Sequence, residues 1–141
     1  MTDDTALKDF LAARSHGVLA TIRRDGRPQL STITYRYDPA AATLIASITE
    51  TRAKTKNMRR DPRVTFHVSS EDGWSYVVAE GRASLTAPAA APGDDTVEAL
   101  VGYYRRAAGE HPDWDEYRQA MVTDQRVLLT VHVEKLLGLV R

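Results

Sequence analysis

Short runs of β-branched and apolar residues, separated by turn residues, recur along the first 85 positions. Such runs predict β-strands. Asp25-Gly26 predicts a hairpin between the first two runs, and Tyr37-Asp38-Pro39 and Glu71-Asp72-Gly73 predict further turns. In order, the predicted strands span residues 17–23, 28–35, 43–49, 64–68 and 74–85, with Gly81 expected at a β-bulge. Five strands joined by short turns favour an antiparallel barrel or sandwich over a doubly wound sheet.

Helical spacing of apolar residues appears three further times. A first helix is predicted after Asp3 or Asp4, which can cap it, and two more are predicted after Asp94-Asp95 and from Pro112. Their apolar positions are, in turn, Leu7, Phe10 and Leu11; Val97, Leu100, Val101 and Tyr104; and Trp114, Tyr117 and Met121. Residues 126–133 return to strand character, and residues 135–141 predict a short final strand.

The most informative stretch lies between the third and fourth strands. Residues 51–60 predict a short helix, which Asp61-Pro62 ends because the residue before proline avoids the α region. Six of the 19 basic residues fall in or just after this helix, and Asp61 is the only acid near them. The six are Arg52, Lys54, Lys56, Arg59, Arg60 and Arg63. Cations in a first helical turn oppose the helix dipole, so Arg52 and Lys54 favour a bound anion.

Polar residues around this helix support the same interpretation. Ser47 and Thr49 share one face of the preceding strand and can donate hydroxyl hydrogen bonds, while Asn57 lies about one turn after Lys54. We expect Arg59, Arg60 and Arg63 to be ordinary surface charges. The alternative, in which the whole basic run is simply a solvated helix face, stays open at this point.

Two further groups could contact a ring-shaped ligand. Gln29 and Ser31 share one face of the second strand and could bind the polar edge of a heteroaromatic ring, or they could lie on an exposed sheet face. Trp74 and Tyr76 share a face of the long strand and could form a pocket wall, although aromatic residues in strands more often belong to a core or an interface.

Composition excludes several classes of function. The formal net charge is +0, which argues against nucleic-acid and anionic-membrane partners, and there is no cysteine to serve as nucleophile, metal ligand or disulfide partner. The four histidines are scattered without metal-ligand spacing, and no hydrolase elbow or nucleotide-binding glycine loop is present. We expect one domain over residues 1–141, no membrane segment, and a cytoplasmic location.

Several motifs together are similar to a known family. They are Gly17-Val18-Leu19-Ala20-Thr21, Asp25-Gly26-Arg27-Pro28-Gln29-Leu30-Ser31, Arg52-Ala53-Lys54-Thr55-Lys56-Asn57, Arg60-Asp61-Pro62-Arg63, Asp72-Gly73-Trp74 and a later block over residues 94–124. The chain resembles the pyridoxamine 5'-phosphate oxidase-like split β-barrel flavoproteins, and most of all the branch that binds the deazaflavin coenzyme F-420.

That resemblance implies a fold and a site. The fold would be mainly β: a six-stranded antiparallel split β-barrel of the FMN-binding type with flanking helices, paired as a homodimer with cofactor sites at the subunit interface. The cofactor's phosphate and acidic tail would lie on Arg52, Lys54 and Asn57. The other implied cofactor-binding residues are Ser47, Ile48, Thr49, Thr55, Gln29, Ser31, Trp74 and Arg126.

The implied activity is a reductase. In this branch reduced F-420 passes a hydride from its C5 to an electron-poor small-molecule acceptor, the protein supplies orientation and electrostatics, and no side-chain nucleophile or metal takes part. Two alternatives remain: an FMN-dependent oxidoreductase of the oxidase type, and a protein that carries F-420 without turnover. Nucleic-acid binding, suggested only by the basic run beside Tyr35 and Tyr37, is a distant fourth.

Overall fold

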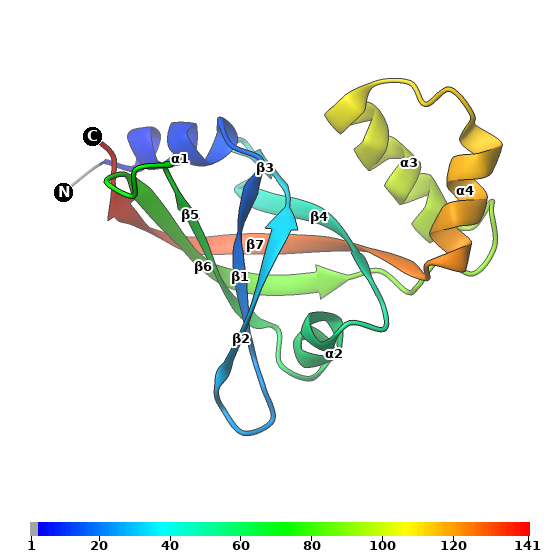
Figure 1. The fold of residues 1–141 in the computed structure, drawn as a ribbon, viewed down its shortest axis with the longest axis horizontal. Helices are drawn as coiled ribbons and strands as arrows, with labels where there is room; N and C mark the ends of the chain where they lie inside the picture. Colours follow the sequence, from blue (N-terminus) through cyan, green and yellow to red (C-terminus); the bar gives the residue numbers. More distant parts are fainter. Residues whose placement is uncertain (1–2) are drawn as a thin grey trace.

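The computed structural model describes residues 3–141 as one curled antiparallel sheet with four helices around it (Figure 1). The strands run in the spatial order β2-β1-β5-β6-β7-β4-β3. Their bounds are β1 His16–Ile22, β2 Pro28–Thr34, β3 Arg36–Asp38, β4 Thr43–Thr49, β5 Arg63–Ser69, β6 Tyr76–Leu85 and β7 Arg126–Leu139. The helices are α1 Asp4–Ala12, α2 Ala53–Arg60, α3 Asp95–Ala108 and α4 Trp114–Thr123.

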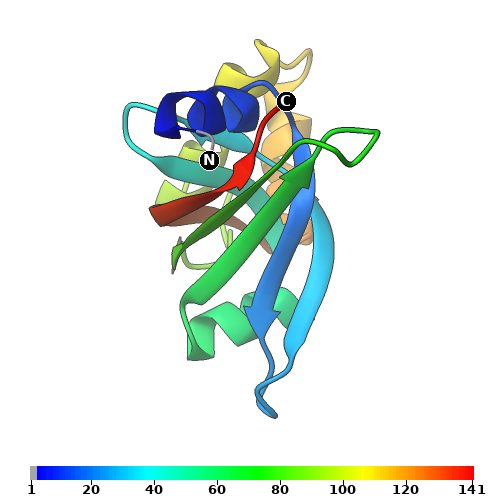
Figure 2. The same ribbon diagram turned by 90° about the vertical axis from the view of Figure 1, so that its left-hand side faces the viewer.

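The sheet closes into a barrel because β2, at one edge, contacts β4, near the other. Alternate residues of the strands fill its interior, and Leu19, Val127 and Leu129 are completely buried there. Figure 2 shows α1 across one end of the barrel and α2 near the other. The Tyr35 hydroxyl donates to the Leu11 carbonyl over 2.6 Å and so ties α1 to the barrel. The predicted split barrel is confirmed.

A seventh strand, β3, stands where a turn was predicted at Tyr37-Asp38-Pro39. Tyr37 is only 7% exposed and pairs with Leu44 of β4. Because burial of the Tyr37 ring favours extended backbone here, the turn follows later, at residues 39–42. The prediction of a turn starting at Tyr37 was therefore wrong. Strand β6 also begins later than predicted, at Tyr76, which leaves Trp74 in the preceding turn.

The last strand, β7, is continuous, although two separate strands were predicted. The pairings Glu80–Lys135 and Gly81–Val133 leave Glu134 as an extra residue, so a bulge does occur opposite Gly81, but β7 carries it. A Cβ atom on Gly81 would lie 2.2 Å from the His132 carbonyl oxygen. Glycine is required at this position because the two backbones approach so closely.

Helices α3 and α4 form a hairpin beside the barrel, with a small core of their own around Leu100 and Met121. Asp94 and Asp113 cap them, accepting from the backbone N–H groups of Val97 and Glu116 at 2.8 and 3.1 Å. Because Asp113 is the cap, α4 starts two residues after the predicted Pro112. None of the four helices, within residues 3–141, is long and apolar enough to cross a bilayer.

Candidate functional site: a cationic cleft beside β4

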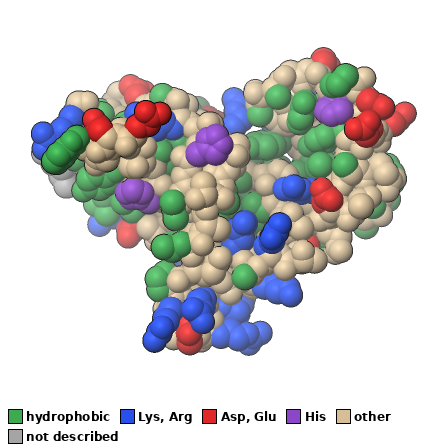
Figure 3. Space-filling model, viewed as in Figure 1, with side chains coloured by type: hydrophobic (Ala, Val, Ile, Leu, Met, Phe, Trp, Pro, Cys, Tyr) green, Lys and Arg blue, Asp and Glu red, His purple; other side chains and the backbone are tan. Residues whose placement is uncertain are grey.

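A cleft of about 390 Å³ lies between β2, β4 and the start of α2, on the side of β4 that faces away from the barrel core. Its lining residues are Thr32, Ile33, Thr34, Ser47, Ile48, Thr49, Arg52, Lys54 and Arg126. In Figure 3, Lys and Arg side chains border the hollow between the barrel and the α3–α4 hairpin. The cleft therefore combines hydroxyl groups with three cations and has no acidic lining residue.

The three cations come from two elements, α2 and β7, and repel one another. Arg52 is the N-cap residue of α2 but makes no side-chain capping bond, Lys54 lies in the first helical turn, and Arg126 begins β7 opposite Thr49 of β4. Burial lowers the pKa of Lys54, and the charges of Arg52 and Arg126 lower it further. Within residues 3–141, neither Arg52 nor Lys54 has an ion pair or a side-chain hydrogen bond to relieve this repulsion.

Arg126 is held in place while part of its guanidinium stays unsatisfied. One terminal nitrogen donates to the Ser47 carbonyl over 3.3 Å, which fixes the side chain against β4. Its Nε is buried and has no hydrogen-bond partner among the described residues, since the nearest carboxylate, that of Asp124, is 3.9 Å away. A buried donor of a charged group that lacks a hydrogen bond is costly unless a ligand supplies one, so the cleft suits an anion.

The other arginines of the basic run have protein partners. Arg59 bonds to the Glu50 carboxylate at 2.7–3.2 Å, and Arg60 donates to the Ile22 carbonyl at 2.7 Å. Arg63 pairs with Asp61 at 2.8 Å, and its hydrogen bonds hold the pKa of that carboxyl to about 2. Asp61 is thus not the only acid near the run, because Glu50 neutralises Arg59. Only Arg52 and Lys54 of the run line the cleft.

Thr55, Asn57 and Gln29 lie behind the cleft rather than in it. Thr55 is fully buried and donates to the Thr49 carbonyl over 2.7 Å. Asn57 donates to the Thr21 hydroxyl, which donates to the Gln29 side-chain oxygen, each over 3.1 Å. These bonds fix α2 against β1, β2 and the end of β4. Direct contacts of the three side chains with a cofactor stay predictions.

Strand β2 lines the cleft with Thr32 and Thr34 from the face opposite to the one expected, and with Ile33 from the expected face. Ser31 pairs with the completely buried Leu19, and its hydroxyl is buried with no hydrogen-bond partner in the described chain. Thr32 and Thr34, which sequence reasoning did not select, line the cleft. The period-two alternation separates these two sets, but it does not say which set faces the ligand.

Trp74 is distant from the cleft within one chain. Its side chain is 65% exposed in the β5–β6 turn and lines a different pocket, with Phe10 and Arg14. The Arg141 guanidinium lies 5.6 Å from its ring centroid. One chain therefore brings together Ser47, Ile48, Thr49, Arg52, Lys54 and Arg126, and does not bring Gln29, Ser31, Thr55, Asn57 or Trp74 into the same cleft.

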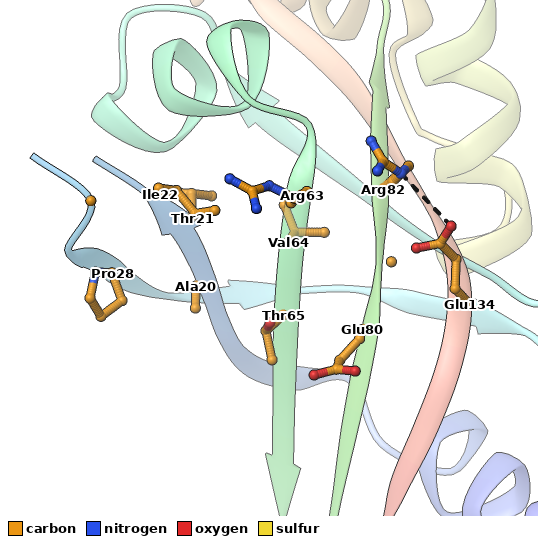
Figure 4. A pocket seen from close by; sticks show the side chains of 12 residues that line it. Ala20, Thr21, Ile22, Pro28, Arg63, Val64, Thr65, Glu80, Arg82 and Glu134 are labelled. Atoms are coloured by element: carbon orange, nitrogen blue, oxygen red, sulfur yellow. Dashed lines mark ion pairs between the residues drawn. The ribbon is translucent and has the colours of Figure 1, made fainter. Parts of the chain in front are cut away.

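A second pocket, of about 350 Å³, lies on the outer face of β1, β5 and β6 (Figure 4). Its charges are balanced: Arg82 pairs with Glu134 at 3.8 Å, Glu80 also lines it, and Arg63 is bound to Asp61. Within residues 3–141, no group of three His, Cys, Asp or Glu side chains is placed to hold a metal ion. The cleft beside β4 is the better candidate site because two of its three cations, Arg52 and Lys54, have no ion pair within residues 3–141.

The fold and this cleft define a split β-barrel protein with a cationic cleft on the outer face of β4. The chain belongs to the pyridoxamine 5'-phosphate oxidase family, whose model matches residues 3–139. A curated relative, 28% identical over 129 residues, is an F-420H(2)-dependent biliverdin reductase of Mycobacterium tuberculosis. The matched region covers 92% of this chain and 82% of that relative.

Solved structures share the fold. One described as an F-420 reductase is 25% identical, with a TM-score of 0.66, and the match covers 92% of this chain and 94% of that one. A conserved hypothetical protein of Mycobacterium tuberculosis is 24% identical, with a TM-score of 0.72 over 98% of this chain and 84% of the other. The second likeness establishes the fold alone.

Proposed function

We propose that this protein is a deazaflavin-dependent reductase, which binds coenzyme F-420 in the cleft beside β4 and reduces a small electron-poor organic acceptor. The observation that carries the proposal is the convergence of Arg52, Lys54 and Arg126 in a cleft with no acidic lining residue. Membership of the family and the similarity to an F-420H(2)-dependent reductase support it.

The lining residues fit such a cofactor. Arg52, Lys54 and the unsatisfied Nε of Arg126 would bind its phosphate and acidic groups, and the Ser47 and Thr49 hydroxyls would add hydrogen bonds. When bound, reduced F-420 supplies the hydride from C5 of its ring. The residues of this chain bind and orient the cofactor and stabilise its negative charge, and no side-chain nucleophile is required.

We further propose that the active form is a homodimer. Tyr76 and Leu139 pair across β6 and β7, and each is more than a third exposed at 38% and 37%, so the barrel presents apolar surface that a second copy could cover. In that assembly Trp74 would be free to border the partner's cleft. A monomeric mass by light scattering at the concentrations used for assays would contradict the dimer.

FMN is the second candidate cofactor, since its phosphate would suit the same cations and the family is named for an oxidase. Titration of the purified protein with F-420 and with FMN, followed by cofactor fluorescence, separates the two. We expect F-420 to bind at least about tenfold more tightly. A clear preference for FMN, or a yellow chromophore retained on purification, would contradict the proposal.

Turnover distinguishes an enzyme from a carrier. Reduced F-420 is mixed with quinone, enone and tetrapyrrole acceptors, and its reoxidation is followed by absorbance with and without the protein. We expect acceptor-dependent reoxidation well above the protein-free rate for at least one acceptor class. Tight F-420 binding with no acceleration for any of them would favour the carrier.

A further inference from the structure

A smaller pocket, of about 200 Å³, lies between strands β3 and β4 and helix α3. Its lining residues are Arg36, Tyr37, Asp38, Pro39, Ile45, Tyr103 and Arg106. Two of them are arginines from different elements, Arg36 from β3 and Arg106 from α3, and the one acid is Asp38.

The two arginines have no ion-pair partner within residues 3–141, whereas the carboxylate of Asp38 already accepts hydrogen bonds from the backbone. Within residues 3–141, neither Arg36 nor Arg106 makes an ion pair or a side-chain hydrogen bond. An Asp38 carboxylate oxygen accepts from the backbone N–H groups of Ala40 and Ala41 at 3.0 and 3.3 Å and so belongs to the turn after β3. Arg105, the next residue on α3, differs because it pairs with Glu110 at 3.2 Å.

The Tyr103 hydroxyl adds hydrogen-bonding capacity. Burial raises the pKa of Tyr103, and the charge of Arg36 only partly opposes that shift, so the hydroxyl stays protonated and can donate. Tyr103 has no hydrogen-bond partner for this group among the described residues. Tyr37 also lines the pocket, but its ring packs in the barrel core, on the face of β3 opposite to Arg36 and Asp38, so its hydroxyl is not counted here. Two guanidinium groups beside one free hydroxyl suit a carboxylate.

This pocket adjoins the cleft beside β4 along the same strand. Ile45 lines the pocket and Ser47 lines the cleft, and both point to the same outward face of β4. Residues two apart on a strand are about 7 Å apart, so one ligand can reach both sites. Basic side chains border the hollow between the barrel and the α3–α4 hairpin over this region (Figure 3).

We propose that the pocket of Arg36, Tyr103 and Arg106 is a second anion site, which binds a carboxylate of a ligand whose body lies in the cleft beside β4. The proposal rests on the proposed function, because the body of the ligand must be bound in the cleft beside β4. The carboxylate can come from an acidic acceptor or from the glutamate tail of the cofactor. The two sources predict different responses when the pocket is neutralised.

The test variant is Arg36→Gln/Arg106→Gln, with Arg105→Gln as the matched control, which removes a charge from the same helix outside the pocket. The first measurement is biliverdin binding without cofactor, followed by absorbance, beside its dimethyl ester, which has no free carboxylate. The second is binding of F-420 with and without its glutamate residues. Circular dichroism and thermal unfolding confirm that each variant is folded.

If the carboxylate belongs to the acceptor, the double variant weakens biliverdin binding about tenfold or more and leaves the ester unaffected. If it belongs to the cofactor, F-420 binding weakens by a similar factor while the glutamate-free form is unchanged. Partial recovery in Arg36→Lys/Arg106→Lys supports a charge-based role in either case.

Changes below about twofold for every probe, or equal losses in Arg105→Gln, would overturn the second site. So would a wild-type protein that binds none of the carboxylate probes. Failure of the proposed function looks different: the wild-type protein then binds neither form of F-420, while the biliverdin measurement still reports on the pocket.

Discussion

Lys54 is the residue whose ionisation the cleft alters most. Its pKa in the free protein is lowered by burial and by the neighbouring Arg52 and Arg126, and a bound anion would favour the charged form and raise that pKa again. Binding therefore takes up a proton once the pH exceeds the free-state pKa.

The expected result is an alkaline loss of affinity. The F-420 dissociation constant should be independent of pH well below the lowered pKa of Lys54, then rise by up to about tenfold per pH unit above it. Lys54→Met should bind more weakly but lose this alkaline step, and Lys56→Met, outside the cleft, should keep it. The cofactor's own ionisations affect the wild type and both variants alike. Identical pH dependence of the dissociation constant in all three proteins would therefore contradict the role of Lys54.

For single residues, the sequence predicts some members of the cleft and not others. Arg52 and Lys54 could be selected because a helix start is a local feature, readable from a strand, a cationic turn and Asp61-Pro62. The position of Arg126 opposite Thr49 depends on the register of β4 against β7, which joins residues 77 positions apart. Its place in the cleft came from the resemblance, not from any local pattern.

Helix α2 is the element on which the cleft depends, and buried polar bonds fix its position. The Thr55 hydroxyl joins the first turn of α2 to the end of β4 through the Thr49 carbonyl. Thr55→Val keeps the shape of the side chain but leaves a buried acceptor without this donor. We expect the free energy of unfolding to fall by about 1–2 kcal/mol, measured by urea denaturation.

The control for that change is Thr51→Val, at an exposed position one turn earlier, which should alter stability by less than about 0.5 kcal/mol. Equal stability of the two variants would show that the Thr55–Thr49 bond does not hold the helix.

Strand β2 shows why elements are harder to orient than to find. Its existence and hairpin were predicted from Asp25-Gly26, yet its polar residues occupy both faces. Gln29 faces inward because Thr21 and Asn57 give it buried partners on β1 and α2. Polar residues usually mark the outer face of a strand, and this network between distant elements reverses the rule.

At the scale of the whole molecule, the barrel gathers cations that are far apart in sequence along the outer face of β4. Arg52 and Lys54 come from α2 and Arg126 from β7, and the smaller pocket beside α3 adds Arg36 from β3 and Arg106 from α3. The formal net charge of the chain is nevertheless +0, so this positive region is a local product of the fold.

The overall architecture was accessible from the sequence because turn signals and the whole-chain resemblance agree. The short β3 and the pocket beside α3 were not, since each depends on side chains meeting across the tertiary structure. In the proposed homodimer, the place of Trp74 relative to a cofactor would depend on a second copy of the chain, which no pattern within one chain can specify.

The most direct test of the central claim is the affinity of Arg52→Gln/Lys54→Met for F-420, measured by fluorescence titration near neutral pH. Arg24→Gln/Arg27→Gln is the control, because it removes two exposed charges from the β1–β2 turn, outside the cleft. We predict that the dissociation constant rises about thirtyfold or more in the first variant and less than about threefold in the control. Unchanged affinity in a folded Arg52→Gln/Lys54→Met protein would contradict the account.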